Sequence, residues 1–146
     1  MPHITLRISA GGPLLQFMVG VSGPRARALQ TANQTIPAPI LVTGLIDTGA
    51  SCTSIDASIL RQLNIPSTGT TPVHTPSTQP NVPHIANLYD ISLVLVHPLI
   101  TRTFSALAVT ESQLVHQGIQ ALIGRDILAC CLFTYDGAGQ SFCLGF

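Results

Sequence analysis

The chain has 146 residues, enough for one domain with a sizeable core, and its net charge is zero when histidine is neutral. Only 8% of the residues are charged, against about 25% in an ordinary soluble domain. The arginines are scattered and lysine is absent, so the sequence excludes the basic surface of a nucleic-acid-binding protein. A surface so poor in charge favours burial in an oligomer.

The apolar segments are too short to cross a membrane. The run at residues 91–96 is interrupted by Ser92, and a membrane helix needs about 20 apolar residues. Residues 1–9 lack the basic start and apolar block of a secretion signal. We therefore expect a cytoplasmic protein without a membrane partner.

The cysteines and histidines show no metal-binding pattern. The cysteines, at positions 52, 130, 131 and 143, form no C-x-x-C pair, so we expect reduced thiols that pack as small apolar side chains. The histidines, at positions 3, 74, 84, 97 and 116, form no H-E-x-x-H motif. Solvated histidines are favoured over a metal pair at His74 and His84. The sequence thus predicts no metal and no cofactor.

Apolar runs with alternating or β-branched residues predict a mostly β fold. In chain order, the expected strands are 3–9, 14–22, 39–46, 52–55, 87–97, 102–110, 120–123, 132–136 and 139–146. The strands 87–97 and 102–110 are expected to form a hairpin. Helix is scarce: the candidates are residues 56–64, with Asp56 as the N-cap, and residues 125–131.

Two connections stand apart from this pattern. Residues 22–39 are a polar stretch of 18 residues, for which we expect a long loop. Residues 66–83 carry five of the eleven prolines. Because proline restricts the backbone to extended or turn conformations, we expect a protruding arm there instead of packed structure. The sequence shows no internal repeat.

Asp47 ends the apolar strand in "ILVTGLIDTGAS" (40–51). A charged, unpaired carboxylate at the end of a buried strand costs several kcal/mol, so its position requires a reason. One alternative is a turn in which Asp47 is a cap. The other is a functional loop, in which Gly49 permits close approach and Thr48 supplies a hydroxyl donor. Ala50 and Ser51 would leave room for an extended ligand.

Two motifs resemble those of the retropepsins, the single-domain aspartic proteases of retroviruses and their bacterial and cellular relatives. The first is "LIDTGAS" around Asp47, and the second is "ALIGRDIL" at residues 121–128. The segments "LYDISLVLV" (88–96) and "PHITLRIS" (2–9) are also similar to strands of that family. The motifs occur in the family's order, with Gly124 77 positions after Asp47, so the resemblance covers nearly the whole chain.

The resemblance implies a single domain at residues 1–146, built as a closed β-barrel with one or two short helices. It also implies a flap hairpin at about residues 70–87 and activity as a homodimer. Asp47 would be the catalytic aspartate, and Thr48 would tie the two active-site loops together across the dimer. Gly49 and Ala50 would line the floor beneath the substrate, and Ser51 would complete the loop.

The second motif would be structural: Gly124, Arg125 and Asp126 would support the active-site loop, with Arg125 as the buttress. Two departures from the family are visible. The expected flap tip, residues 75–83, has three prolines and no glycine. Ser51 stands where many retroviral enzymes carry an aspartate that receives the arginine, so Arg125 must find other partners.

Peptide hydrolysis requires a base that activates water and an acid that polarises the carbonyl. Two adjacent carboxylates that share one proton do both, as is well established for aspartic protease dyads. The other acidic residues are explained by simpler structural roles. Asp56 and Asp136 suit a cap and a turn, Asp126 suits a helix start, and Asp90 and Glu111 suit a solvated surface. One D-T-G motif without a repeat therefore requires a homodimer with a two-fold axis.

Three functions follow in order of preference. The first is an aspartic endopeptidase that cuts extended peptides bound as an added strand. The second is a catalytically silent retropepsin-like module for peptide binding or dimerisation. The third is a structural β-barrel with a chance motif.

Overall fold

The computed structural model describes residues 1–146. The strands are β1 (His3–Arg7), β2 (Leu14–Val21), β3 (Ile40–Ile46), β4 (Ser54–Asp56), β5 (Gly69–Val73), β6 (His84–Val96), β7 (Thr101–Ser112), β8 (Ala121–Ile123), β9 (Leu132–Asp136) and β10 (Ser141–Gly145). The helices are α1 (Gly23–Thr31), α2 (Ala57–Gln62), α3 (Arg125–Leu128) and the 3₁₀ turn η1 (Val115–Gln117).

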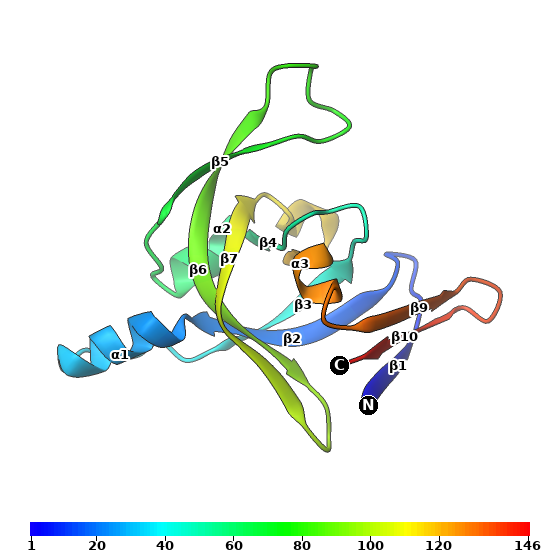
Figure 1. Ribbon diagram of the computed structural model, residues 1–146, viewed down its shortest axis with the longest axis horizontal. Helices are drawn as coiled ribbons and strands as arrows, with labels where there is room; N and C mark the ends of the chain where they lie inside the picture. The colour runs from blue at the N-terminus through cyan, green and yellow to red at the C-terminus, as the bar shows by residue number, and fades with distance from the viewer.

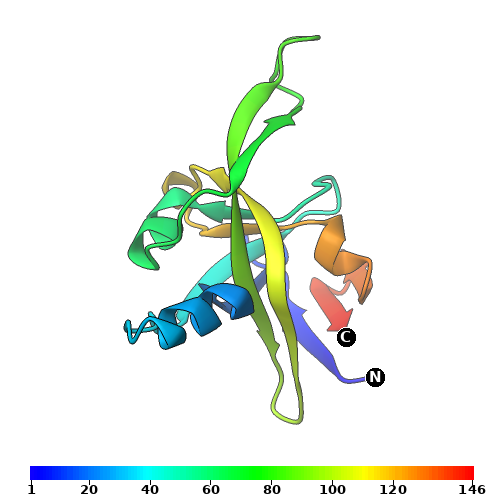
Figure 2. The same ribbon diagram turned by 60° about the vertical axis from the view of Figure 1, so that its left-hand side comes forward.

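Most of the strands form one closed barrel. They pair in the order β2-β3-β8-β4-β7-β6, and β6 returns to pair with β2. The pairs β3–β8 and β4–β7 are parallel, and the others in the barrel are antiparallel. Closure removes the exposed edges that an open sheet would leave for aggregation. The predicted mostly β closed barrel is confirmed (Figures 1 and 2).

The core follows from alternation along the strands. On β2, Leu15, Phe17 and Val19 are buried while Gln16 between them is exposed. On β6 the buried side chains are Ile91, Leu93 and Leu95. Because successive side chains of a strand point to opposite faces, this two-residue period fills the barrel interior with apolar groups. The alternation that predicted the strands therefore also selects the core.

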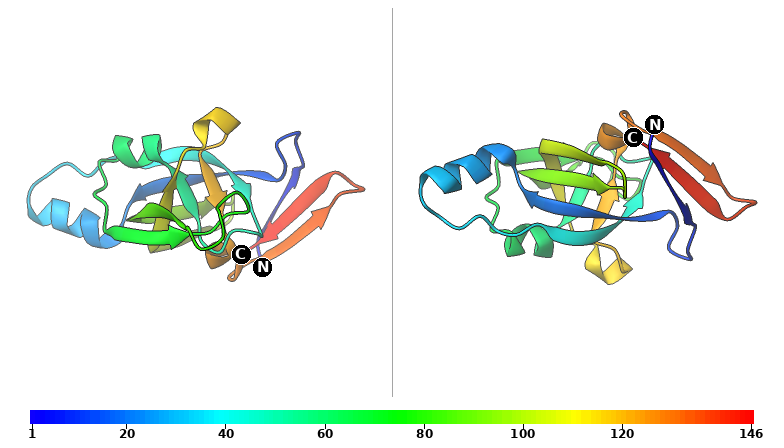
Figure 3. Two further views of the ribbon diagram at one scale, coloured as in Figure 1. Left: turned by 90° about the horizontal axis from the view of Figure 1, so that it is seen from above. Right: turned by 90° about the horizontal axis from the view of Figure 1, so that it is seen from below.

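A second, three-stranded sheet lies at one end of the barrel. Its order is β1-β10-β9, so the C-terminal strand lies between the N-terminal strand and β9. Phe142 and Leu144 on β10 are buried and belong to the same core as the barrel residues. Both termini lie at this end, and α1 lies at the opposite end (Figure 3).

An arm projects from the barrel rim (Figures 1 and 2). We call residues 69–88 the β5–β6 arm; in it β5 pairs with the start of β6, from Gly69 opposite Leu88 to Val73 opposite His84. β5 is the last strand of the sheet order, and an edge strand tolerates Pro72, which has no N–H to donate. The expected protrusion is present, and it begins with a paired strand.

The expected long loop at residues 22–39 is wrong in its first half, which forms helix α1. Ser22 caps the helix by accepting a hydrogen bond from the backbone N–H of Arg25, and Pro24 stands in the first turn. Residues 25–30 are good helix formers. Asn33 adopts φ 53°, a left-handed conformation that ends helices. The helix has few apolar residues and none of them is fully buried, so apolar periodicity did not reveal it.

The other expected elements are present with shifted ends. The strand expected at 52–55 is β4 at Ser54–Asp56, and the expected hairpin is β6–β7. The helices expected at 56–64 and 125–131 are shorter, as α2 and α3. None of the helices has the length and hydrophobicity that crossing a membrane requires. The cytoplasmic location stays a prediction.

Asp56 is confirmed as the N-cap of α2, and it is almost fully buried. One carboxylate oxygen accepts from the backbone N–H and the hydroxyl of Ser58, at 2.8 and 2.6 Å. The other accepts from the N–H groups of Leu114 and Val115, at 2.6 and 3.0 Å. Burial acts to raise the pKa of Asp56, but these hydrogen bonds outweigh it and lower the pKa from 3.8 to about 2. Asp56 thus joins α2 to the segment after β7.

Asp56 makes the fold sensitive to acid in a defined window. Because its folded pKa is depressed, its stabilisation is present above about pH 4 and is lost as the pH falls towards about 2. We expect Asp56→Asn to lower the free energy of unfolding by about 1–3 kcal/mol at pH 6, because an amide nitrogen cannot accept the N–H groups. The free energy of unfolding of the variant should also fall less between pH 4 and pH 2 than that of wild type.

Urea unfolding at a series of pH values measures both effects. Asp136→Asn is the matched control, because that exposed carboxylate accepts a hydrogen bond only within its own turn, from the Gly139 N–H. Stability curves for wild type and Asp56→Asn that stay parallel from pH 6 to 2 would contradict the assignment.

Candidate active site

The pairing of β3 with β8 sets the position of Asp47. These two short segments run parallel, with Gly44 opposite Ala121 and Ile46 opposite Ile123. The backbone N–H of Asp47 continues the ladder by donating to the carbonyl of Ile123 at 2.9 Å. The two sequence motifs therefore end side by side at the barrel rim, although they are far apart in the chain.

The loop after Asp47 turns around its carboxylate. The backbone N–H of Gly49 donates to Asp47 Oδ1 at 2.9 Å, and the N–H of Ala50 donates to the Asp47 carbonyl at 3.2 Å. A Cβ atom on Gly49 would lie 3.1 Å from Oδ1, so a small residue suits this position. Asp47 is half-buried, and Thr48 is exposed. The loop thus orients the carboxylate and leaves it reachable from solvent.

Arg125 at the start of α3 holds this loop at three points. Its Nη1 donates to the carbonyls of Thr48 and Gly49, at 2.9 and 3.2 Å. Its backbone N–H donates to the carbonyl of Ala50 at 2.9 Å. The acceptors are backbone carbonyls, so an acid at Ser51 is not required for Arg125 to contact the loop. Both side-chain contacts of Arg125 are exposed to solvent.

A second contact joins the motifs beneath the loop. Asp126 accepts hydrogen bonds from the N–H and the hydroxyl of Thr53, both at 2.8 Å. The Thr53 hydroxyl also accepts from the N–H of Gly124 at 3.1 Å. A Cβ on Gly124 would lie 2.5 Å from the carbonyl carbon of Cys52, so only glycine permits this approach. Thr53 is a supporting residue that the sequence analysis missed, and no motif marks it.

The remaining acids lie outside this loop network. Asp90 and Asp136 are exposed, and Asp56 belongs to the cap of α2. The loop therefore holds one carboxylate per chain, that of Asp47. The chain has no group of three or more His, Cys, Asp or Glu side chains arranged to hold a metal ion.

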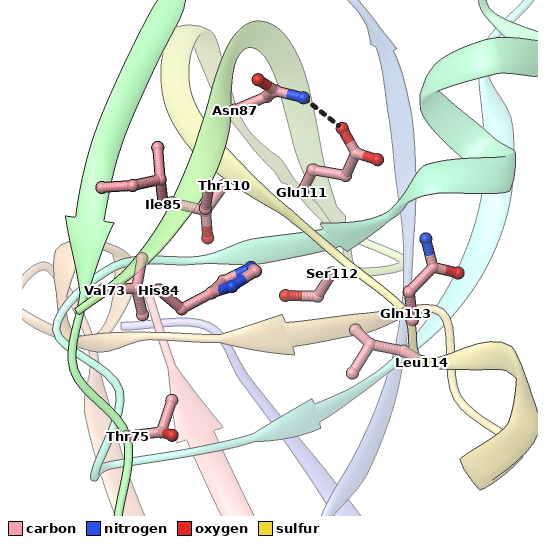
Figure 4. A pocket seen from close by; sticks show the side chains of 11 residues that line it. Val73, Thr75, His84, Ile85, Asn87, Thr110, Glu111, Ser112, Gln113 and Leu114 are labelled. Atoms are coloured by element: carbon pink, nitrogen blue, oxygen red, sulfur yellow. Dashed lines mark hydrogen bonds between the residues drawn. The ribbon is translucent and has the colours of Figure 1, made fainter. Parts of the chain in front are cut away.

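A cavity of about 550 Å³ lies between the β5–β6 arm and the barrel rim (Figure 4). Its lining residues are Val73, Thr75, His84, Ile85, Ala86, Asn87, Thr110, Glu111, Ser112, Gln113 and Leu114. Asp47 is not among them, so the cavity does not itself contain the carboxylate.

The expectation of a solvated Glu111 is wrong. Glu111 is half-buried, and its Oε2 accepts from the Tyr89 hydroxyl at 2.8 Å and from the Asn87 amide at 3.1 Å. The hydrogen bond to Glu111, together with burial and the carboxylate charge, raises the pKa of Tyr89. The sequence offered no sign of this contact, because the partners are more than twenty residues apart.

Comparisons with known proteins show likeness in structure only. No protein-family model and no curated protein sequence matches the chain. A crystal structure of a retropepsin-like aspartic protease from Rickettsia conorii is similar, with a TM-score of 0.60 at 15% identity. The match covers 99% of this chain and 91% of that one. The retroviral protease-like domain of Ddi1 from Leishmania major matches at a TM-score of 0.41 and 12% identity, over 86% and 82% of the two chains.

At 15% identity, the first match bears on fold and not on activity. It extends over almost every element described above, including the barrel, the arm and the terminal sheet, and it agrees with the resemblance of the two motifs. The chain therefore has the fold of the retropepsin-like aspartic proteases.

Proposed function

We propose that this protein is an aspartic endopeptidase in which Asp47 is the catalytic residue. The observation that carries the proposal is the geometry of the Asp47 loop. A half-buried carboxylate stands at the rim of a retropepsin-like barrel, oriented by the Gly49 N–H and braced by Arg125. If Asp47 were only a cap, the local turn would be sufficient to hold it. The additional contact from Arg125, which belongs to the second motif, supports a functional loop instead.

The proposed reaction uses two Asp47 carboxylates that share one proton. The ionised carboxylate takes a proton from water, and the water oxygen forms a bond to the peptide carbonyl carbon. The protonated carboxylate donates its proton to the carbonyl oxygen, giving a neutral tetrahedral intermediate. When the C–N bond breaks, the nitrogen takes a proton from one carboxylate, and a hydroxyl of the intermediate returns its proton to the other.

One carboxylate per loop makes a homodimer part of the proposal, with a two-fold axis between two Asp47 side chains. Thr48 is exposed, and its contact within the chain is through its backbone carbonyl, so its hydroxyl is available to a partner loop. The low charge of the sequence also suits a buried surface. The dimer is the active species in this proposal.

We assign the β5–β6 arm as the flap, and an extended peptide or protein segment as the substrate. The arm projects above the rim, where a peptide could add as a strand beneath it. One observation favours the alternative of a silent binding module: residues 74–83 at the tip contain three prolines and no glycine. A stiff tip would close over a substrate less readily than a glycine-rich one.

Asp47→Asn should abolish cleavage, lowering the rate by at least about a thousandfold, because an amide cannot share the proton. The fold should be unchanged, since asparagine has the same shape and its side-chain oxygen can still accept from the Gly49 N–H. The measurement is cleavage of a diverse peptide library, read by mass spectrometry, alongside thermal unfolding. A statine-type inhibitor should bind wild type more tightly than the variant.

Asp90→Asn is the control, because it removes one exposed carboxylate elsewhere. If Asp47→Asn cleaved peptides at the wild-type rate, Asp47 would be a turn residue and not the catalytic one. Absence of cleavage by wild type, together with tight peptide binding, would favour the silent module.

Dilution tests the dimer. If the active site combines two Asp47 loops, activity per chain should fall as the enzyme concentration drops below the dimer dissociation constant. Thr48→Ala should move this fall to higher concentration, because the proposed tie between loops is lost. Sedimentation over the same range gives the oligomeric state. A fully active monomer would refute both the dimer and the shared-proton mechanism.

Arg125→Ala should lower activity by about tenfold and stability by only about 0.5–1.5 kcal/mol, because the two carbonyls that lose a donor are exposed and can bind water. Arg125→Lys should restore part of the activity, since lysine supplies a donor without the planar fork. Arg27→Ala on exposed α1 is the matched control. Unchanged kinetics in Arg125→Ala would show that the brace does not position Asp47.

A further inference from the structure

One face of β6 looks into the cavity beneath the β5–β6 arm. Successive side chains of a strand point to opposite faces, so His84, Ala86 and Leu88 share a face of β6. Ala86 is almost fully buried, and Leu88 is paired with the buried Thr110 of β7. This face, which we call the cavity face, is therefore turned toward the barrel, and His84 lies on it.

The one carboxylate of the lining lies on the opposite face. Asn87 and Tyr89 occupy that face of β6, and both donate to Oε2 of Glu111. Glu111 stands between Thr110 and Ser112 on β7, so alternation also directs it away from those two side chains. No arginine lines the cavity, and the chain has no lysine. The cavity face therefore carries no carboxylate and no permanent positive charge.

His84 is at the cavity and open to solvent. It is the first residue of β6, it lies opposite Val73 of β5, and its side chain is exposed. Residues directly opposite each other in an antiparallel pair point to the same face, so Val73 flanks the imidazole. Figure 4 shows the His84 ring extending into the cavity toward Ser112. A ligand in the cavity can therefore reach the ring.

The polar groups around His84 are neutral donors. Thr75, Ser112 and Gln113 line the cavity with hydroxyl and amide groups. On the cavity face, β5, β7 and the segment after β7 present no acidic or basic side chain to the imidazole. A protonated imidazole has two N–H donors and would be the one cation on this face. Because no carboxylate of the lining faces it, that charge is left for a ligand.

We propose that His84 is a specificity-determining residue and that the cavity favours a glutamate side chain of the bound peptide. The inference rests on the proposed function for the idea that a peptide lies beneath the arm, and it adds the chemical class of one substrate side chain. The protonated imidazole would donate to the glutamate carboxylate, and the glutamate methylene groups would pack on Val73 and Ala86.

The proposal predicts a specific dependence on pH. Histidine is the side chain whose charge changes within about pH 5–8, whereas glutamate is ionised throughout that range. The preference for glutamate should therefore be present in mild acid and absent in mild base.

The test compares glutamate with glutamine, which has nearly the same shape and no charge. Peptide libraries carry one or the other at a single scanned position, with the remaining positions mixed and free of acidic residues. The C-termini are amidated, so the scanned glutamate is the only carboxylate. Binding is measured by fluorescence anisotropy in the Asp47→Asn background, where no cleavage interferes. At the best position we expect glutamate libraries to bind about fivefold more tightly at about pH 5.5 and equally at about pH 8, as for a partly exposed charge pair.

Adding His84→Gln should bring the glutamate-to-glutamine ratio close to one at both pH values, because the amide is a donor without charge. His74→Gln is the matched control: His74 lies on the same arm outside the lining, so the ratio and its pH dependence should be unchanged. Both histidines are exposed, so neither change should disturb the fold. Each ratio is taken at one pH, so an effect of acid on the dimer or on other histidines acts on both libraries alike.

Equal binding of the two libraries at every position in mild acid would overturn the inference, and so would a preference that persists in mild base or in His84→Gln. Loss of the preference in His74→Gln would also overturn it. The first comparison changes nothing in the cavity, so it decides even if His84→Gln fails to fold. Cleavage by wild type is scored separately. A glutamate preference without cleavage would contradict the peptidase and keep the glutamate site; cleavage without the preference would do the reverse.

Discussion

The parallel pairing of β3 with β8 is the constraint on which the candidate site depends. Three residue pairs, ending at Ile46 opposite Ile123, place Asp47 next to Gly124. The backbone at position 124 can come this close to the backbone of Cys52 only because Gly124 has no side chain, since any Cβ there would collide with Cys52. Without this close contact α3 could not reach the Asp47 loop, and Arg125 could not brace it. The barrel is closed on either side of this pair, so the contact is enclosed in a rigid frame.

Two sets of hydrogen bonds join the two motifs within that frame, and they differ in their exposure to solvent. The lower set, between Thr53, Gly124 and Asp126, is largely withdrawn from solvent and joins backbone to side chain in both directions. The upper set, from Arg125 to the loop carbonyls, is exposed. A buried polar group that loses its partner costs more than an exposed one. The lower set should therefore determine assembly of the site, and the upper set should tune the position of Asp47.

The strands of the arm differ from those of the barrel in how many neighbouring strands they pair with. β5 pairs with β6 alone, while each barrel strand has neighbours on both sides. Elements with few packed contacts open at low free-energy cost, which suits a segment that must admit a ligand. Glu111 lies on β7 where this arm leaves the barrel, and its partners Tyr89 and Asn87 come from β6.

Local patterns in the sequence determined much of this architecture. The alternation of apolar and polar residues predicted the strands and the side chains that fill the core. Asp56 correctly predicted the start of α2, and the two motifs identified the segments that meet at Asp47. Helix α1 was missed although its cap and proline are local signals, because its polar surface has no apolar period. These features depend on residues a few positions apart, where backbone propensity and side-chain alternation act directly.

Only the tertiary structure decided the contacts between distant segments. The acceptors of Arg125, the role of Thr53 beneath the loop and the partners of Glu111 join residues that are between 22 and 77 positions apart. No local pattern encodes such pairs, since they form only when the barrel closes and brings strand ends together. The cavity has the same origin, because its lining comes from β5, β6 and β7 and the segment that follows. Sequence placed the chemistry on individual residues, and barrel closure determined which of them meet.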